Sequence, residues 1–287
     1  MKSIPNTLAP KLNQLRNSQY WLLGIGAGLI LVHLSVAWKA EQASLLGASF
    51  VFWIAISSLI WDKRNKLNFE SGIFASFCGL ILIVLALFKS AFPINTGGVA
   101  HLFPIVSALG LALIASGFKG LKQYGGELFA LCFLAAPKLL PPSILDLSLV
   151  TAKFSTVILW YTGFQVSRNG VHISLPSESV VVNLPCSGID QIFHLLGFAI
   201  IALIMFPMKR WQKILVPIIA VVLAFIINGF RVALMAILVN QGDKQAFDYW
   251  HMGDGSLVFS LITVSVFGYF CLLLLGKKKK SPPKPVT

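Results

Sequence analysis

Three side chains in the C-terminal half of the sequence have the types that acyl transfer needs. Cys186 lies in the segment 184–188, Arg231 lies inside a long apolar run, and His251 lies in a short polar segment beyond it. A cysteine thiolate is a strong nucleophile toward a carbonyl group. A histidine carries protons near neutral pH, and an arginine stabilises a thiolate or a developing oxyanion. The three residues predict a nucleophile, an acid/base and an electrostatic partner.

The sequence around Cys186 predicts an activated thiol at the start of a helix. The apolar run 187–206 follows Cys186 directly, so we expect Cys186 in its first turn, next to Gly188. Amide groups at a helix N-terminus carry positive partial charge, which favours the thiolate. The alternative is that Cys186 is a small residue that eases a turn and has no chemical role.

Other polar residues are predicted to lie beside this group. Asn228 is three positions before Arg231, so both lie on one helix face. Cys186, Asp190 and His194 have i, i+4, i+8 spacing and share another face. A charge inside an apolar run is costly and is usually functional or paired, and Asp190 is the candidate partner of Arg231. We predict a polar seam in which Asp190 and His194 hold the site rather than react.

His251 is expected in a loop, at residues 249–255, before the last apolar run. Gly255 permits a tight entry into that run. The alternative is an interfacial histidine beside Tyr249 and Trp250, since such aromatic residues are common at membrane surfaces.

The composition predicts a membrane protein. Apolar residues make up 56% of the 287 residues and charged residues only 11%, against about 25% charged in an average soluble domain. The apolar residues form runs of about the 18 residues or more that a membrane span needs. We predict an all-α polytopic membrane protein with about eight transmembrane helices, at residues 21–38, 44–61, 72–88, 101–118, 127–140, 187–206, 214–240 and 255–276.

The segment between the fifth and sixth spans has a different character. Residues 148–166 predict an amphipathic helix along the membrane interface. A turn at 168–170 and strands at 171–175 and 179–184 predict a small β-hairpin, which must lie outside the hydrocarbon because its edges are open. We therefore predict one integral membrane domain over 1–287: five spans in 1–147, the extracytoplasmic helix and hairpin in 148–186, three spans with the site in 187–276, and a basic cytoplasmic tail in 277–287.

Basic residues predict the orientation. Sixteen Lys and Arg flank one side of the eight spans and five flank the other, which places both termini in the cytoplasm and the three reactive residues on the outer face of the plasma (inner) membrane. The net charge of +13 is explained by this orientation and by contact with the lipid bilayer, so no nucleic-acid partner is expected. The inner set is Lys2, Lys11, Arg16, Lys63, Arg64, Lys66, Lys119, Lys122, Lys209, Arg210, Lys213, Lys277, Lys278, Lys279, Lys280 and Lys284; the outer set is Lys39, Lys89, Lys153, Arg168 and Lys244.

No cofactor or metal is predicted. The four cysteines form no CxxC pair and no Cys/His cluster with zinc spacing.

With its motifs in this order, the sequence resembles the exosortase/archaeosortase family of membrane transpeptidase-like enzymes, with a weaker likeness to the cyanobacterial exosortases. The matching pieces are residues 185–188 (Pro-Cys-Ser-Gly), 228–231 (Asn-Gly-Phe-Arg), and His251 with Gly255 four residues on. The resemblance implies that Cys186 is the thiol nucleophile, Arg231 its electrostatic partner and His251 the acid/base.

The resemblance also implies the partners. The substrates would be secreted, membrane-anchored proteins whose C-terminal sorting signal has a short motif, a span and a basic cluster. The enzyme would cleave them by way of a thioacyl intermediate and pass them to a glycan, a lipid or water at the cell surface. Asp190 and His194 lie outside the family motifs.

Two other functions fit the same residues. The first is a non-enzymatic transporter or assembly subunit for surface polysaccharide export, with Arg231 and Asp190 as a charged pathway. The second is a structural membrane scaffold, in which none of these residues has a role beyond stability.

Overall fold

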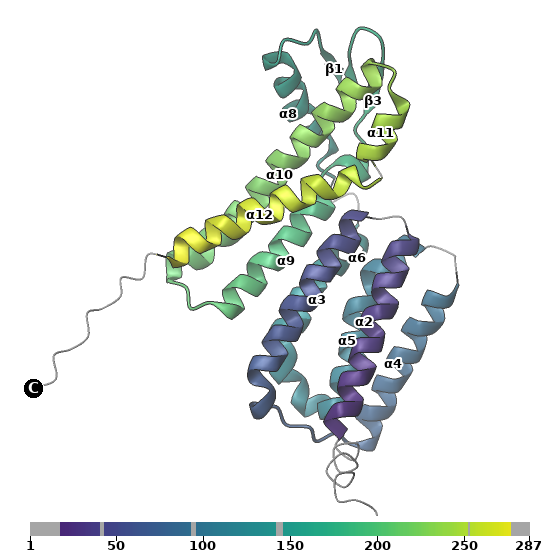
Figure 1. Cartoon of the computed structure of the whole chain (residues 1–287), viewed down its shortest axis with the longest axis vertical. Coiled ribbons are helices and arrows are strands. Elements are labelled where there is room, and N and C mark those ends of the chain that lie inside the picture. The colour runs from purple at the N-terminus through teal and green to yellow at the C-terminus, as the bar shows by residue number, and fades with distance from the viewer. Residues whose placement is uncertain (1–17, 41–42, 93–95, 142–145, 252, 277–287) are drawn as a thin grey trace, which may run out of the picture. The chain divides into compact units, whose positions relative to one another are not determined.

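The computed structural model describes residues 18–40, 43–92, 96–141, 146–251 and 253–276 (Figure 1). The chain divides into two compact units, Met1–Leu139 and Leu140–Thr287. The predicted organisation of residues 1–287 as one integral membrane domain stays a prediction. The predicted basic tail, 277–287, lies outside the described residues.

The first unit contains a helix for each of the five predicted N-terminal spans. Their outward side chains include large apolar residues such as Leu31, Ile54 and Phe77, each more than half exposed, as expected for helices that face lipid. The helices are α2 (Ser18–Lys39), α3 (Ala43–Lys63), α4 (Ile73–Ala91), α5 (Thr96–Gly120) and α6 (Gly125–Leu139), with the short 3₁₀ turns η1 (Arg64–Lys66) and η2 (Leu121–Tyr124).

Small residues and buried hydrogen bonds hold this first unit together. A Cβ atom added to Gly79 of α4 would lie 2.5 Å from the carbonyl oxygen of Gly110 in α5, so the two helices approach at backbone contact. His33 of α2 is fully buried. Its Nδ1 accepts a hydrogen bond of 2.8 Å from Trp53 Nε1 in α3, and its Nε2 lies 2.8 Å from the carbonyl oxygen of Ala100 in α5. The imidazole of His33 therefore connects α2 to α3 and α5.

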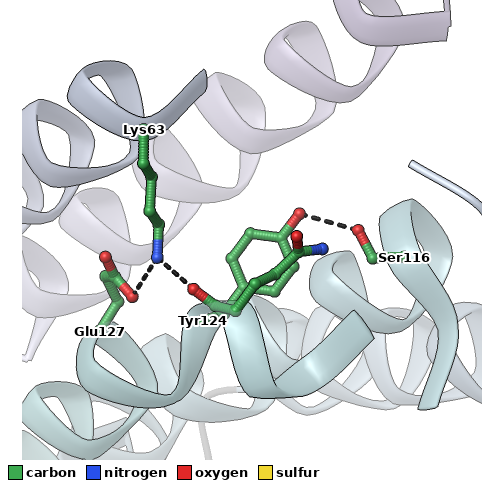
Figure 2. A network of polar contacts seen from close by, with 5 residues as sticks. Lys63, Ser116, Tyr124 and Glu127 are labelled. Atoms are coloured by element: carbon green, nitrogen blue, oxygen red, sulfur yellow. Dashed lines mark hydrogen bonds and ion pairs between the residues drawn. The ribbon is translucent and has the colours of Figure 1, made fainter. Parts of the chain in front are cut away.

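An ion pair links α3 to α6 (Figure 2). The Nζ of Lys63 lies 2.7 Å from the Oε2 of Glu127, and it also donates a hydrogen bond to the carbonyl oxygen of Gln123. The same ammonium group faces the ring of Tyr124, whose hydroxyl lies 2.9 Å from that of Ser116. Glu127 is thus a buried carboxylate whose charge is compensated.

The second unit is built around its longest helix, α10 (Arg210–Asn240). This helix contacts α8 (Ser148–Tyr161), α9 (Ile189–Met205), α11 (Lys244–His251), α12 (Gly255–Leu275) and one strand of a small sheet (Figure 1). An apolar cluster joins the sheet to α8 and α10, and Cys186 packs against it. The buried members are Ala152, Leu159, Ile173, Leu175, Val182, Val232, Ala233 and Ala236.

The sheet has one strand more than the predicted hairpin. Its strands are β1 (Ser167–Asn169), β2 (His172–Ser174) and β3 (Ser179–Val181), antiparallel in the order β1-β2-β3. The predicted turn at 168–170 is present at its last residue, whereas Arg168 and Asn169 belong to β1 and pair with Ile173 and His172. The chain reverses at Gly170, whose φ of +60° suits glycine.

Helix α8 turns three hydroxyl residues toward the protein, whereas its charged residue, Lys153, is exposed. Ser148, Thr151, Ala152, Ser155 and Leu159 are buried, whereas Leu149, Val150, Val157 and Trp160 are exposed. The helix ends at Tyr161 rather than at residue 166. The predicted position of this helix along the membrane interface stays a prediction.

The helices make this a multi-pass membrane protein. Six described helical stretches are long and apolar enough to cross a membrane, and α9 is a shorter apolar helix. One of the six, Gly98–Leu139, contains both α5 and α6, which pack against each other after the chain bends at Gly117, where φ is +65°. The predicted number of eight spans stays a prediction.

Candidate active site

Cys186 lies in a tight turn before α9 rather than inside it. The turn is the 3₁₀ helix η3 (Leu184–Cys186), in which the amide N–H of Cys186 donates to the carbonyl oxygen of Asn183 at 2.9 Å. Gly188 then adopts a left-handed conformation, with φ of +88°, and α9 begins at Ile189. The prediction that Cys186 occupies the first turn of a continuous helix was therefore wrong, because Gly188 interrupts the helical conformation.

This interruption also changes the predicted polar seam. Asp190 lies in the first turn of α9, and His194 lies one turn later with 8% of its surface exposed. Cys186 does not share their helix, so the i, i+4, i+8 face does not form. The pairing of Asp190 with Arg231 stays a prediction.

His251 lies beside the thiol. Its Nε2 is 3.5 Å from the Sγ of Cys186, although the two residues are far apart in the sequence. His251 is the last residue of α11 and not part of a loop, which corrects the prediction. The ring of Phe247, one turn earlier in α11, lies against the imidazole with ring centroids 4.9 Å apart. A short helix and an aromatic neighbour thus orient the histidine.

Arg231 reaches the same histidine from α10. Its Nη2 donates a hydrogen bond of 2.6 Å to the backbone carbonyl oxygen of His251. Its Nε is buried and makes no hydrogen bond to the part of the chain that the structure describes. The guanidinium therefore fixes the end of α11, while its buried Nε–H has no acceptor among the described residues.

Asn228 holds the cysteine turn. Its side chain is 1% exposed, and its Nδ2 donates a hydrogen bond of 3.0 Å to the carbonyl oxygen of Cys186. A Cβ atom at Gly188 would lie 2.6 Å from this same Nδ2, so the close approach of the turn to α10 requires glycine there. The structure thus brings Asn228, Gly188 and Cys186 together.

Gly255 shapes the connection between α11 and α12. A Cβ atom there would lie 2.8 Å from the ring of Trp250, which directly precedes His251 in α11. The predicted tight entry into the last helix is present.

Two residues of α8 that were not predicted as site residues also bond to the segments of the site. The Oγ1 of Thr151 donates to the carbonyl oxygen of Ser187 at 2.8 Å, and the Oγ of Ser155 donates to the carbonyl oxygen of Gly229 at 3.0 Å. Both residues are fully buried. Their four-residue spacing was the available signal, since it places two hydroxyl groups on one face of a helix.

The electrostatic surroundings favour the neutral forms of both reactive groups. Burial raises the pKa of the Cys186 thiol above its usual 9.0, and the positive charge of Arg231 opposes this rise. Burial lowers the pKa of His251 below its usual 6.5, and Arg231 lowers it further, while Asp248 opposes both. Desolvation thus has a larger effect on the pKa of Cys186 than the nearby positive charge, and the role of Cys186 as the nucleophile stays a prediction.

The described residues contain no group of three or more His, Cys, Asp or Glu side chains that could hold a metal ion. The side chains that meet at this site supply a thiol, an imidazole and a guanidinium.

Comparison with known proteins identifies the family. A protein of Methanocaldococcus jannaschii named probable archaeosortase E is 32% identical to this chain over 112 residues, which are 39% of this chain. The match spans 57% of that relative, a little over half its length. No solved structure matches the chain. The sequence model of the family described as transmembrane exosortase (Exosortase_EpsH) matches residues 38–268, which is most of the chain, and it includes Cys186, Arg231 and His251. This chain therefore belongs to the exosortase family of transmembrane proteins.

Proposed function

We propose that this protein is a membrane cysteine transpeptidase or protease that processes the C-terminal sorting signals of secreted proteins. The observation that carries the proposal is the contact of 3.5 Å between the Cys186 Sγ and the His251 Nε2, with Arg231 bonded to that same histidine. Membership of a family described as transmembrane exosortase, and a relative named as an archaeosortase, support this class of reaction.

The first chemical step is the attack of Cys186 on a peptide carbonyl carbon. Because the thiol and the imidazole are both neutral at rest, the thiol proton passes to the Nε2 of His251 as the sulfur–carbon bond forms. The carbon–nitrogen bond then breaks, and His251 returns this proton to the departing amine. The product is a thioacyl enzyme and a released C-terminal segment.

The second step regenerates the thiol. An acceptor nucleophile, which is a glycan, a lipid or water, attacks the thioacyl carbon and gives its proton to His251. The carbon–sulfur bond breaks, and the proton passes to the sulfur of Cys186. A neutral imidazole suits both steps, since it accepts a proton before it donates one.

In this mechanism Arg231 acts through its positive charge. Its positive charge lowers the free energy of the Cys186 thiolate as the proton leaves, and the same charge stabilises a developing oxyanion. Its hydrogen bond to the His251 carbonyl oxygen also holds the imidazole at the thiol.

The distribution of basic residues supports a site on the outer side of the plasma membrane, with both termini in the cytoplasm. A substrate anchored by its own C-terminal span would then present its cleavage motif beside the cysteine turn. The small sheet fits this placement, because open strand edges do not occur within lipid.

The test replaces Cys186 in the living cell. The size of secreted proteins that end in a shared motif, a span and basic residues is followed in membranes with Cys186→Ala and with Cys186→Ser. We expect only the uncleaved form in both variants, whereas Cys132→Ala, a change at an exposed cysteine of the first unit, leaves cleavage intact. Normal cleavage in both Cys186 variants would exclude the proposed function. If Arg231→Met then abolished surface polysaccharide export, a transporter would be supported instead.

A further inference from the structure

Helix α8 supplies hydroxyl groups to the two segments that carry Cys186 and Arg231. Thr151 bonds to the carbonyl oxygen of Ser187, the residue that follows the thiol, and Ser155 bonds to that of Gly229, two residues before Arg231. The two hydroxyl groups are one helical turn apart on the buried face. One face of α8 therefore donates hydrogen bonds to the backbone close to both residues.

The backbone after the thiol is held from two helices. Asn228 of α10 donates to the carbonyl oxygen of Cys186 at 3.0 Å, and Thr151 of α8 donates to the next carbonyl oxygen, that of Ser187, at 2.8 Å. Ser187 itself is fully buried. Two consecutive peptide groups are thus fixed in direction, and they set where the Cys186 side chain points.

The packing of α8 against α10 leaves little freedom for this arrangement to shift. A Cβ atom at Gly229 would lie 2.2 Å from the ring of Phe154, so the two helices approach closely at the level of Ser155. By contrast, the hydroxyl of Thr156, on the same helix, donates to its own helix at Ala152 and to no other segment among the described residues. Thr151 and Ser155 differ from it because their hydroxyl groups donate hydrogen bonds to other segments of the chain.

We propose that Thr151, supported by Ser155, is a positioning residue that holds Cys186 where the charge of Arg231 and the imidazole of His251 act on it. The proposal rests on the role of Cys186 as the nucleophile. Replacing Thr151 by Val exchanges the hydroxyl for a methyl group of similar size and leaves a buried carbonyl oxygen without its donor. The turn then relaxes, and Cys186 is less strongly coupled to Arg231.

The experiment measures this coupling without any substrate. The purified full chain is treated with iodoacetamide over a range of pH, and mass spectrometry follows alkylation of the peptide that carries Cys186. Arg231→Met removes the positive charge, so it slows alkylation at pH 7 by about tenfold, the effect of about one pKa unit from a nearby charge. In a Thr151→Val background, the same Arg231→Met change slows alkylation by less than about threefold.

Three further backgrounds make the result specific. Thr156→Val and Thr151→Ser keep the hydroxyl bond to Ser187 and so keep the full effect of Arg231→Met. Ser155→Ala lowers that effect in the same direction as Thr151→Val, and it provides the measurement if Thr151→Val does not fold. A full tenfold effect in the Thr151→Val and Ser155→Ala backgrounds would overturn the proposal. Normal substrate cleavage by Cys186→Ala would instead reject the proposed function and leave this coupling measurable.

Discussion

The Nη2 of Arg231 donates a hydrogen bond of 2.6 Å to the backbone carbonyl oxygen of His251, although the arginine belongs to α10 and the histidine ends α11. A guanidinium can hold one acceptor while its other N–H groups remain directed elsewhere. Here one group fixes the histidine, and the charge acts on Cys186. The position of His251 and the electrostatic stabilisation of the Cys186 thiolate thus depend on the same side chain.

Because Arg231 supplies both a directed hydrogen bond and a positive charge, two substitutions at this position should have different effects. Arg231→Lys keeps a positive charge but loses the planar group that has several directed donors. We expect alkylation of Cys186 to stay within about threefold of the unchanged protein, whereas substrate cleavage falls by at least about tenfold. Arg231→Met should lower both rates. Parallel measurement of alkylation and cleavage separates the two functions, and full cleavage activity in Arg231→Lys would contradict the need for the guanidinium.

The pH dependence of the Cys186 thiol follows from its burial. Its pKa lies above 9.0, so the thiolate fraction is small at pH 7 and rises with pH. We expect the alkylation rate of Cys186 in the folded protein to increase up to a higher pH than the rate of the same cysteine in denaturant. The rate is measured for both states by mass spectrometry of one peptide. A folded-state profile that levels off at lower pH than the denatured one would show that positive charge outweighs burial.

The order of the membrane helices could be predicted from the sequence, because long apolar runs are a direct consequence of the lipid environment. The helices α2 to α6, α9, α10 and α12 each lie where an apolar run predicts one. The approach of Cys186, Arg231 and His251 could also be expected, since the predicted orientation of the spans places all three toward the same side of the membrane.

The local form of the site could not be predicted in the same way. Glycine adopts both left-handed and helical conformations, so residues 186–190 alone did not show that Gly188 separates Cys186 from α9. The roles of Thr151 and Ser155 were hidden for a different reason. Hydroxyl residues in helices often bond to their own backbone, as Thr156 and Thr162 do here, and only the packing of α8 distinguishes the two kinds.

Gly188 offers a test of the close contact between the cysteine turn and α10. Gly188→Ala places a Cβ in a left-handed conformation and also within 2.6 Å of the Asn228 amide nitrogen. The matched control is Gly163→Ala, since Gly163 has a similar φ of +90° but nothing within 4 Å of the added atom. Both changes have the conformational cost of about 1–2 kcal/mol, and only Gly188→Ala has the steric one.

We therefore expect Gly188→Ala to lower the thermal unfolding midpoint more than Gly163→Ala, and to change the alkylation rate of Cys186, which the control leaves unaltered. Tryptophan fluorescence of the purified protein in detergent reports the midpoint. Equal effects of the two changes on both quantities would mean that the contact with Asn228 does not constrain the turn.

The ion pair of the first unit gives a prediction about stability. Lys63→Met leaves Glu127, whose side chain is 7% exposed, as a buried carboxylate without its cation. Removing one partner of a buried pair is strongly destabilising, whereas replacing both by apolar residues is often neutral. Since Lys63 is itself 25% exposed, we expect a loss of no more than about 3 kcal/mol from the single change. The double change Lys63→Met with Glu127→Leu should recover most of it.

Thermal unfolding of the purified protein measures both variants, with Lys122→Met, at an exposed lysine of η2, as the control. A double variant as unstable as the single one would show that the hydrogen bond from Lys63 to the Gln123 carbonyl oxygen, rather than the charge pair, connects α3 to this end of α6.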